Sequence, residues 1–537
     1  MQAGVLLKIV LVSAAMVWVW SLPEDAGRDR GPARRTYRKH VLAVLAVLAV
    51  VAHVRFFQFH GPYVFHFHEM FHYCVGSKYY GEVGHYRLYD FAVIADSETD
   101  HFFDVLPVIR NMETLALVPA SSAMQYRDEC RTRFTPERWG QFKADMDGLK
   151  KLAPGRKLDP GVRWQYILTD MGYNPTPAWS LAANLITNRL DVGRRSVLTM
   201  LALIDFALLI VMFLGIGATF GWEAAGLGIV FLATNQMVRF SEIGGGFLRY
   251  DWLVALVLGV CALKTGRKVP AGALMGYSTM MRVFPVLFAA CVGVYGICRW
   301  VRTRRIPGGD VGFAAAFLAT CGLLAAGAVV RFGPQCWGEF ARKIAVHNDL
   351  LHPKSVGLEN LFLYQGETME RDLADRTGPN GSVSFEEAKR QRREQQRPWI
   401  RLAGIVLVVG VVSVLWMRRV CPYEAAVLGT VLVCALVAPT RYYHSYLVLP
   451  VVMFATWLPR RNAKVGLMLL FSMVIAGHFV ELSGFVMWTE QFCQSLFLTG
   501  LAVFLIVSFH ATKDSSAKAD CGRTDGGPNE TVGTTTP

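Results

Sequence analysis

Apolar runs long enough to cross a bilayer recur along most of this 537-residue chain. A membrane-spanning helix needs about 20 predominantly apolar residues. The chain is 53% hydrophobic with a mean hydropathy of +0.32, which excludes an ordinary water-soluble protein of this size. We predict an all-α polytopic membrane protein with about 12–13 membrane segments. The runs span 4–21, 41–58, 198–216, 217–235, 250–264, 270–299, 311–331, 400–417, 422–440, 443–458, 464–483 and 490–510.

Basic residues gather on one side of the bilayer when these runs are threaded through it in alternation. Lys and Arg accumulate in the cytoplasmic loops of membrane proteins. Topology therefore explains the formal charge of +14 better than nucleic-acid binding does. Alternation places 59–197 and 332–399 outside the cytoplasm, with Arg194-Arg195 as a local exception. The clusters that fall inside are 22–40, 264–268, 299–305, 418–419 and 460–461.

The two outer segments contain local helix signals. In the first, Thr135 followed by Pro136 predicts the start of a helix, with Thr135 at the N-cap and Pro136 at the first helical position. In the second, the charged stretch 386–394 is typical of a solvated helix face.

This topology divides the chain into three parts. Residues 1–40 form an N-terminal helix and a basic cytoplasmic segment, 41–511 form the transmembrane domain with its two long extracytoplasmic loops, and 512–537 form a cytoplasmic tail. The tail is rich in Ser, Thr, Gly and Asp, a composition typical of disorder. The 11 cysteines include no C-x-x-C pair, which argues against a thiolate metal site. The sequence leaves open whether Cys130 and Cys336, one in each loop, form a disulfide.

The stretch His68-Glu69-Met70-Phe71-His72 lies just beyond the outer end of the run 41–58. Histidines four residues apart share one face of a helix, and a glutamate beside the first can activate a metal-bound water. This pattern permits a membrane zinc metalloprotease. His66 and His85 could supply a further ligand. However, no third ligand is evident at the position such proteases require, and the motif follows Gly61-Pro62 instead of lying inside a helix. We expect no metal here and keep the protease as an alternative.

Glu69 has a second interpretation, as a general base that deprotonates an acceptor hydroxyl. The neighbouring histidines and Lys78 would then tune its pKa or bind an anionic leaving group. The run 270–299 is broken at Arg282 and Pro285, and a broken helix with a buried cation often lines an anion site. An ordinary proline kink with a snorkelling arginine is the alternative. Asp205, inside an apolar run, is a candidate partner for an arginine.

Four groups of residues in a fixed order resemble glycosyltransferase family 87, the polyprenyl-phosphate-mannose-dependent mannosyltransferases of the GT-C superfamily. They are Glu69-x-x-x-Tyr73-x-x-Gly76 with Leu88-Tyr89-Asp90, Met281-Arg282-Val283-Phe284-Pro285, Asn348-Asp349-Leu350 with Gly357-Leu358-Glu359-Asn360, and Pro439-Thr440-Arg441-Tyr442-Tyr443-His444-Ser445-Tyr446. The resemblance covers roughly residues 41–460. This chain departs from the family's pattern in having Glu69 for Asp, Arg282 for Lys, extra histidines and a longer first loop.

The resemblance implies a GT-C-like bundle and inverting transfer of a sugar, mannose in that family, from a polyprenyl phosphate. No cofactor is implied, because the lipid phosphate is itself the leaving group. The implied partners are the lipid-linked sugar donor, a glycan, glycolipid or protein acceptor, and membrane lipids, with no nucleic acid. The implied location is the bacterial plasma (inner) membrane with the active site facing outward. A transporter or flippase is a further alternative, although the inverted repeats of transporters are not evident.

The residues singled out above make up one predicted site. The predicted catalytic residues are Glu69, as general base, and His444, for phosphate contact or proton transfer. Arginines suit the phosphate because a guanidinium can bind two of its oxygens at once. The predicted substrate-binding residues are His68, His72, Tyr73, Lys78, Arg249, Arg282, Asn348, Asn360 and Arg441.

Overall fold

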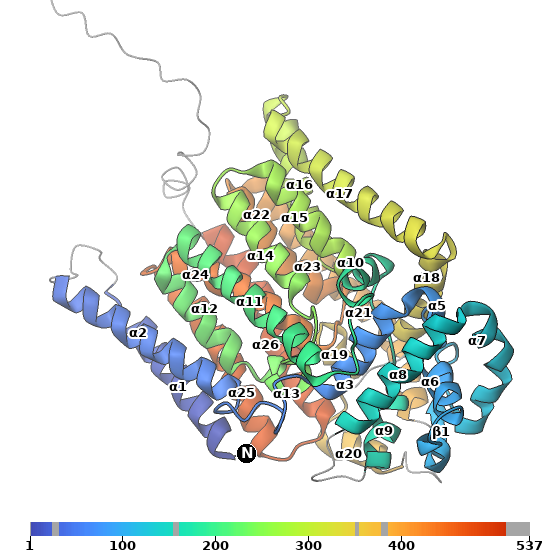
Figure 1. Ribbon diagram of the computed structural model, residues 1–537. Coiled ribbons are helices and arrows are strands. Elements are labelled where there is room, and N and C mark those ends of the chain that lie inside the picture. The colour runs from blue at the N-terminus through green and yellow to red at the C-terminus, as the bar shows by residue number, and fades with distance from the viewer. Residues whose placement is uncertain (1, 24–31, 154–159, 350–353, 377–384, 512–537) are drawn as a thin grey trace, which may run out of the picture.

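The computed structural model describes residues 2–23, 32–153, 160–349, 354–376 and 385–511. Within these residues the chain is predominantly helical (Figure 1). The described sheet has two short antiparallel strands, β1 (Val108–Arg110) and β2 (Leu117–Pro119), with Ile109 opposite Val118. The prediction of an all-α polytopic membrane protein is confirmed.

Eight helices in the described part of the chain are long and apolar enough to cross a membrane. Each coincides with a run predicted from the sequence. Their outer faces remain apolar, as contact with lipid requires: α17 exposes Leu323 and Val330, for example. The eight are α1 (Gln2–Trp20), α2 (Pro32–His53), α11 (Arg195–Phe220), α16 (Val286–Thr303), α17 (Gly308–Phe332), α21 (Phe385–Met417), α25 (Arg461–Leu482) and α26 (Met487–Ala511).

The remaining predicted runs form shorter helices, because the backbone breaks within or beside them. Gly221, at a φ of +92°, ends α11, and the next helix begins one residue later. The break predicted in 270–299 lies between Met281 and Val286. The shorter helices are α12 (Trp222–Thr234), α14 (Asp251–Lys264), α15 (Lys268–Met281), α22 (Pro422–Val427), α23 (Gly429–Leu436) and α24 (Val448–Trp457). They are joined by η5 (Gln236–Val238), α13 (Phe240–Ile243) and η6 (Arg441–Leu447).

Helix α15 packs closely on α17 through two glycines one turn apart. A Cβ atom at Gly272 would lie 2.1 Å from the carbonyl oxygen of Phe313, and one at Gly276 would lie 2.8 Å from that of Phe317. Small residues at this spacing let membrane helices approach until their backbones touch. The contact holds α15 in place and so positions the break at its C-terminal end.

The first long loop folds into its own layer of short helices. Thr135 caps α8 as the sequence predicts, since its hydroxyl accepts the backbone N–H of Arg138 at 3.2 Å. Cys130 in this layer is a buried free thiol, as is Cys336 in the second loop. The elements are α3 (Phe67–Glu69), η2 (Met70–Val75), α4 (Gly76–Lys78), α5 (Tyr80–Val83), α6 (Leu88–Ser97), η3 (Phe102–Val105), η4 (Ala120–Tyr126), α7 (Arg127–Arg133), α8 (Pro136–Leu152), α9 (Pro160–Leu168) and α10 (Pro177–Thr187).

The second loop contributes α18 (Gln335–Asp349), α19 (Glu359–Leu363) and α20 (Glu367–Arg376). The charged stretch 386–394 is helical, as predicted, and continues into the apolar part of the long helix α21. Figure 1 shows α6 to α9 gathered with α18 at one side of the helix bundle. The two loops therefore meet at the same side of the molecule.

Candidate functional site

A cavity of about 850 Å³ lies where the two loops meet the broken ends of the membrane helices. Its wall comes from α3 and η2, from residues 170–176, from α18 and residues 354–360, and from the helix ends around 281–284 and 436–443. The volume is in the range of small-molecule sites, about 300–1,000 Å³. Both loops therefore build a single site, as their predicted placement on one side of the membrane requires.

Most of the predicted site residues line this cavity. The fold brings the first-loop motif, the broken helix and the second-loop asparagines to one place. Asn360 is buried, and its amide donates to the carbonyl of Ser355, so it shapes the wall of the cavity. The predicted residues that line the cavity are His68, Glu69, His72, Tyr73, Arg249, Arg282, Asn348 and Asn360.

The motif itself is a turn of α-helix that continues as a π-helix. His66 precedes α3, and its Nδ1 accepts the backbone N–H of Glu69 at 3.2 Å. The following element, η2, is π-helical, a conformation found frequently at functional sites. The ring centroids of His68 and His72 lie 4.5 Å apart. The two histidines therefore share one face, as their spacing predicts.

Glu69 forms an ion pair with Arg249, whose Nε lies 2.8 Å from its Oε2. The two side chains are only 12% and 2% exposed. The guanidinium lies over the rings of Tyr73 and Tyr442, 4.2 and 5.1 Å from their centroids. Burial raises the pKa of the Glu69 carboxyl, and the charge of Arg249 opposes this rise. A carboxylate in such surroundings is suited to take a proton.

Asp205 fixes the backbone that carries Arg249. One of its carboxylate oxygens, from α11, accepts the backbone N–H of Arg249 at 2.9 Å, and the other lies 3.5 Å from the N–H of Tyr250. Asp205 is therefore the partner of an arginine, as predicted, but through the backbone N–H of Arg249 and not through its guanidinium. The guanidinium of Arg249 is thereby left to face Glu69.

Arg282 lies at the break between α15 and α16, as predicted, and is 7% exposed. Its Nη1 donates to the carbonyl of Met281 at 2.8 Å. Its Nε and Nη2 are buried without a hydrogen-bond partner among the described residues. The guanidinium lies 5.6 Å from the ring of Trp179 and 5.9 Å from that of Tyr443. A buried cation with unused donors on a cavity wall is a ready site for an anion.

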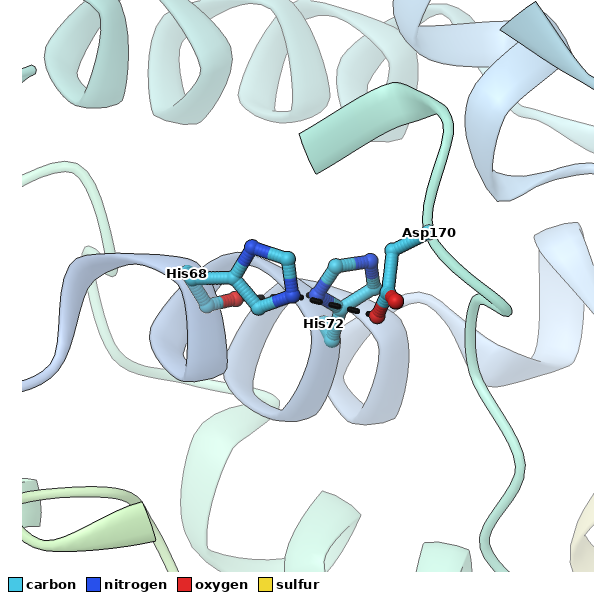
Figure 2. Close-up of side chains that lie close together, drawn as sticks. All are labelled: His68, His72 and Asp170. Atoms are coloured by element: carbon cyan, nitrogen blue, oxygen red, sulfur yellow. Dashed lines mark hydrogen bonds and ion pairs between the residues drawn. The ribbon is translucent and has the colours of Figure 1, made fainter. Parts of the chain in front are cut away.

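His68, His72 and Asp170 form a cluster on the same wall (Figure 2). His68 Nε2 lies 3.1 Å from Asp170 Oδ2, and the Nδ1 of His72 lies 2.9 Å from the carbonyl oxygen of His68. The Nε2 of His72 lies 2.6 Å from the hydroxyl of Tyr89. Burial lowers the pKa of His72 to about 3, so this ring is neutral. Burial alone would raise the pKa of Asp170, but the hydrogen bond and charge of His68 hold it below its ordinary value.

Three predicted site residues, Lys78, Arg441 and His444, lie outside the cavity wall, so for them the prediction is wrong. Lys78 is buried in an ion pair, with its Nζ 2.5 Å from Asp145 Oδ2 and 2.7 Å from the carbonyl oxygen of Leu190. Its charge is therefore neutralised within the first loop, away from the cavity that holds Glu69. The sequence could not show this pairing, because Lys78 and Asp145 are 67 residues apart.

Arg441 and His444 also have partners within the protein and do not face the cavity. Arg441 is held between the carboxylates of Glu242 and Glu490, the latter 2.6 Å from its Nη1. Two acidic partners leave this arginine poorly suited to bind a phosphate. His444 is fully buried, and its Nδ1 lies 3.2 Å from the carbonyl oxygen of Arg441. Neither residue belongs to the cavity wall, so their predicted roles are withdrawn.

Sequence reasoning missed three residues of the site. Asp170 had no local signal, because it is a lone aspartate just after α9, 102 residues from His68. Tyr442 and Tyr443 adjoin Arg441 in a stretch that resembles the family, where Arg441 and His444 are the more conspicuous residues for phosphate binding. Both tyrosines line the cavity, and their rings lie near Arg249 and Arg282.

Comparison with known proteins adds no relative: no family model, curated protein or solved structure matches the chain. The fold and the site define an all-α polytopic membrane protein with a polar cavity where its two long loops meet.

Proposed function

We propose that this protein transfers a sugar from a polyprenyl-phosphate carrier to an acceptor hydroxyl. The observation that carries the proposal is the grouping of one buried carboxylate, Glu69, with two buried arginines, Arg249 and Arg282, on the wall of one cavity. Such a site offers a base for a hydroxyl and cations for a phosphate leaving group.

In this mechanism Glu69 accepts the proton of the acceptor hydroxyl as its oxygen attacks the anomeric carbon. The bond between that carbon and the phosphate oxygen breaks, and the lipid phosphate leaves with the electron pair. Attack opposite the leaving group inverts the configuration of the anomeric carbon. Arg282, with two unused nitrogens, would hold the phosphate first. A phosphate that also reaches Arg249 would compete for its guanidinium and free Glu69 to act as base.

An apolar groove supports a lipid-linked donor. It has a volume of about 790 Å³ and is lined chiefly by α2, α11 and α12, with Gly244 and Gly245 at one end. The carbonyl of Gly245 accepts the backbone N–H of His66, which itself lines the polar cavity. The groove therefore ends beside the cavity, where a chain in the groove would present its phosphate.

A membrane zinc metalloprotease is the second candidate, favoured by the closeness of His68, His72 and Asp170. Peptide hydrolysis at a zinc ion has no evident use for the two buried arginines, Arg249 and Arg282, in the same cavity. The departure of a phosphate leaving group uses both. No observation in the described structure specifically favours the transporter or flippase alternative.

Arg282→Gln is expected to raise the KM for the donor about 10- to 100-fold. The reason is that a hydrogen bond to a charged group contributes about 1.5–3 kcal/mol, and each 1.4 kcal/mol is about tenfold in affinity. Glutamine keeps a donor for the carbonyl of Met281 but removes the charge. The measurement is transfer of radiolabelled mannose from polyprenyl-phosphate-mannose by the purified protein, as a function of donor concentration.

Arg393→Gln is the matched control. Arg393 also lines the cavity, but its Nε lies 3.2 Å from Glu359 Oε2 and its side chain is 38% exposed. Its donor KM should stay within about threefold of wild type, since exposed pairs contribute under about 1 kcal/mol. Equal KM changes in both variants would remove Arg282 from phosphate binding. A wild-type protein that transfers no sugar from any polyprenyl phosphate would refute the proposed function itself.

A further inference from the structure

We propose that His68, His72 and Asp170 form a binding site for one divalent transition-metal ion on the cavity wall. This inference does not depend on glycosyl transfer, and it departs from the expectation of a metal-free site. The motif itself supplies two of the ligands. The third, Asp170, comes from the segment after α9 and becomes visible only in the fold (Figure 2).

The geometry suits a single ion. One ligand atom from each of the three side chains lies within 4.8 Å of the others, and His68 Nε2 and Asp170 Oδ2 are 3.1 Å apart. Ligand atoms at about 2.0–2.2 Å from one ion lie roughly 3–4 Å apart, so small side-chain rotations complete the set. Two of the ligands are one helical turn apart, and their rings already lie side by side.

The surrounding hydrogen bonds prepare His72 as a ligand. Its Nδ1 lies 2.9 Å from the carbonyl oxygen of His68 and must donate the hydrogen, so its Nε2 carries the lone pair. Metal-binding histidines are commonly oriented by such a bond from the other ring nitrogen. The hydroxyl of Tyr89 now donates to this Nε2, but the carbonyl oxygen of Asp170 lies 3.3 Å away as an alternative acceptor. Tyr89 can therefore release His72 without losing a partner.

His68 would bind through Nε2, with its proton carried on Nδ1. In the structure the Nε2 of His68 contacts Asp170 Oδ2, so an ion between them would replace that hydrogen bond. His68 and Asp170 have side-chain exposures of 15% and 43%, whereas His72 is buried. The cluster is thus closed on the protein side and open to the cavity, the arrangement of sites with three protein ligands and one exchangeable position.

The donor set selects the class of ion. Two imidazole nitrogens and one carboxylate oxygen suit zinc and neighbouring first-row divalent ions. Magnesium and calcium prefer sites made wholly of oxygen ligands. The bound ion would have its open position directed at whatever anionic or hydroxyl oxygen occupies the cavity.

The test is zinc binding by the full-length protein in detergent, stripped with chelator and then titrated with Zn²⁺. We expect one equivalent by elemental analysis and no competition from excess Mg²⁺. Asp170→Asn and His68→Asn should each weaken zinc at least about tenfold, since even changes to outer-shell groups cost about 10- to 100-fold. Tyr89→Phe should bind zinc at least as tightly as wild type, because it removes the hydrogen bond that competes for Nε2 of His72.

His347→Asn is the matched control, since His347 lines the same cavity outside the cluster, and it should keep full zinc affinity. Zinc should also raise the melting temperature of wild type but not of Asp170→Asn, because a ligand that binds only the folded state stabilises it. Size-exclusion profiles without metal establish that each variant is folded. Substoichiometric zinc in wild type, or unchanged affinity in folded Asp170→Asn and His68→Asn, would overturn the proposal. Zinc binding with no sugar transfer would leave the metal site standing and refute the proposed function alone.

Discussion

Glu69→Gln is expected to lower the turnover of sugar transfer by about 10²- to 10⁴-fold, the usual contribution of a general base. Glutamine has nearly the same shape and places a neutral amide beside Arg249, but it cannot take a proton at neutral pH. The donor should continue to bind, because its phosphate contacts the arginines. The measurement is kcat for mannose transfer with saturating donor, together with the melting temperature of the variant.

Glu359→Gln is the appropriate comparison, because Glu359 lines the same cavity and is paired with Arg393. Its turnover should remain within a few-fold of wild type. Glu69→Gln should also keep its zinc, which separates the base from the proposed metal ligands. Turnover that persists in a folded Glu69→Gln protein would eliminate Glu69 as the base.

Lys78→Met should reduce the free energy of unfolding by about 3–5 kcal/mol, the usual cost of removing one partner of a buried ion pair. Lys78 and Asp145 are only 5% and 4% exposed, so the carboxylate would be left in the protein interior without its cation. The hydroxyl of Tyr79, 2.6 Å from Asp145 Oδ2, gives only partial compensation. The melting temperature of the detergent-solubilised protein should fall accordingly.

Lys143→Met provides the contrast, since Lys143 pairs with Glu98 at 3.3 Å and both side chains are nearly 30% exposed. Its effect should stay below about 1 kcal/mol, as for other surface pairs. The folded fraction of Lys78→Met should transfer sugar at the wild-type rate. A normal melting temperature combined with lost turnover would return Lys78 to the active site.

The apolar runs predicted the membrane helices because lipid requires long stretches without charge, and this signal is local in sequence. The helix break at Arg282 was predictable for the same reason, as a cation and a proline inside an apolar run are conspicuous. The layer of short helices in the first loop was harder to predict. Its packing depends on contacts between distant residues, and only the cap at Thr135 was evident beforehand.

Charged residues of the candidate site were predicted correctly where the fold leaves their side chains on the cavity wall. The prediction was wrong where a distant residue of opposite charge neutralises the side chain. Glu69 and Arg282 remain in the cavity. Lys78 and Arg441 had equally suggestive positions, but carboxylates 67 and 199 residues away occupy them. Asp170 was missed because a lone aspartate in a polar loop differs in no visible way from its neighbours. Contacts between residues far apart in the sequence depend on the whole fold, and the identity of one residue does not predict them.

The short membrane helices bear on how the protein is made. Helices α12, α14 and α15 have 13, 14 and 14 residues, fewer than the roughly 20 needed to cross the hydrocarbon core alone. Emerging from the ribosome, they cannot be held in the bilayer by their own hydrophobicity. They depend on α11 before them and α16 and α17 after them to supply a protein surface. We therefore expect this region to enter the membrane as a group, so that the cavity is completed only after the second loop has been synthesised.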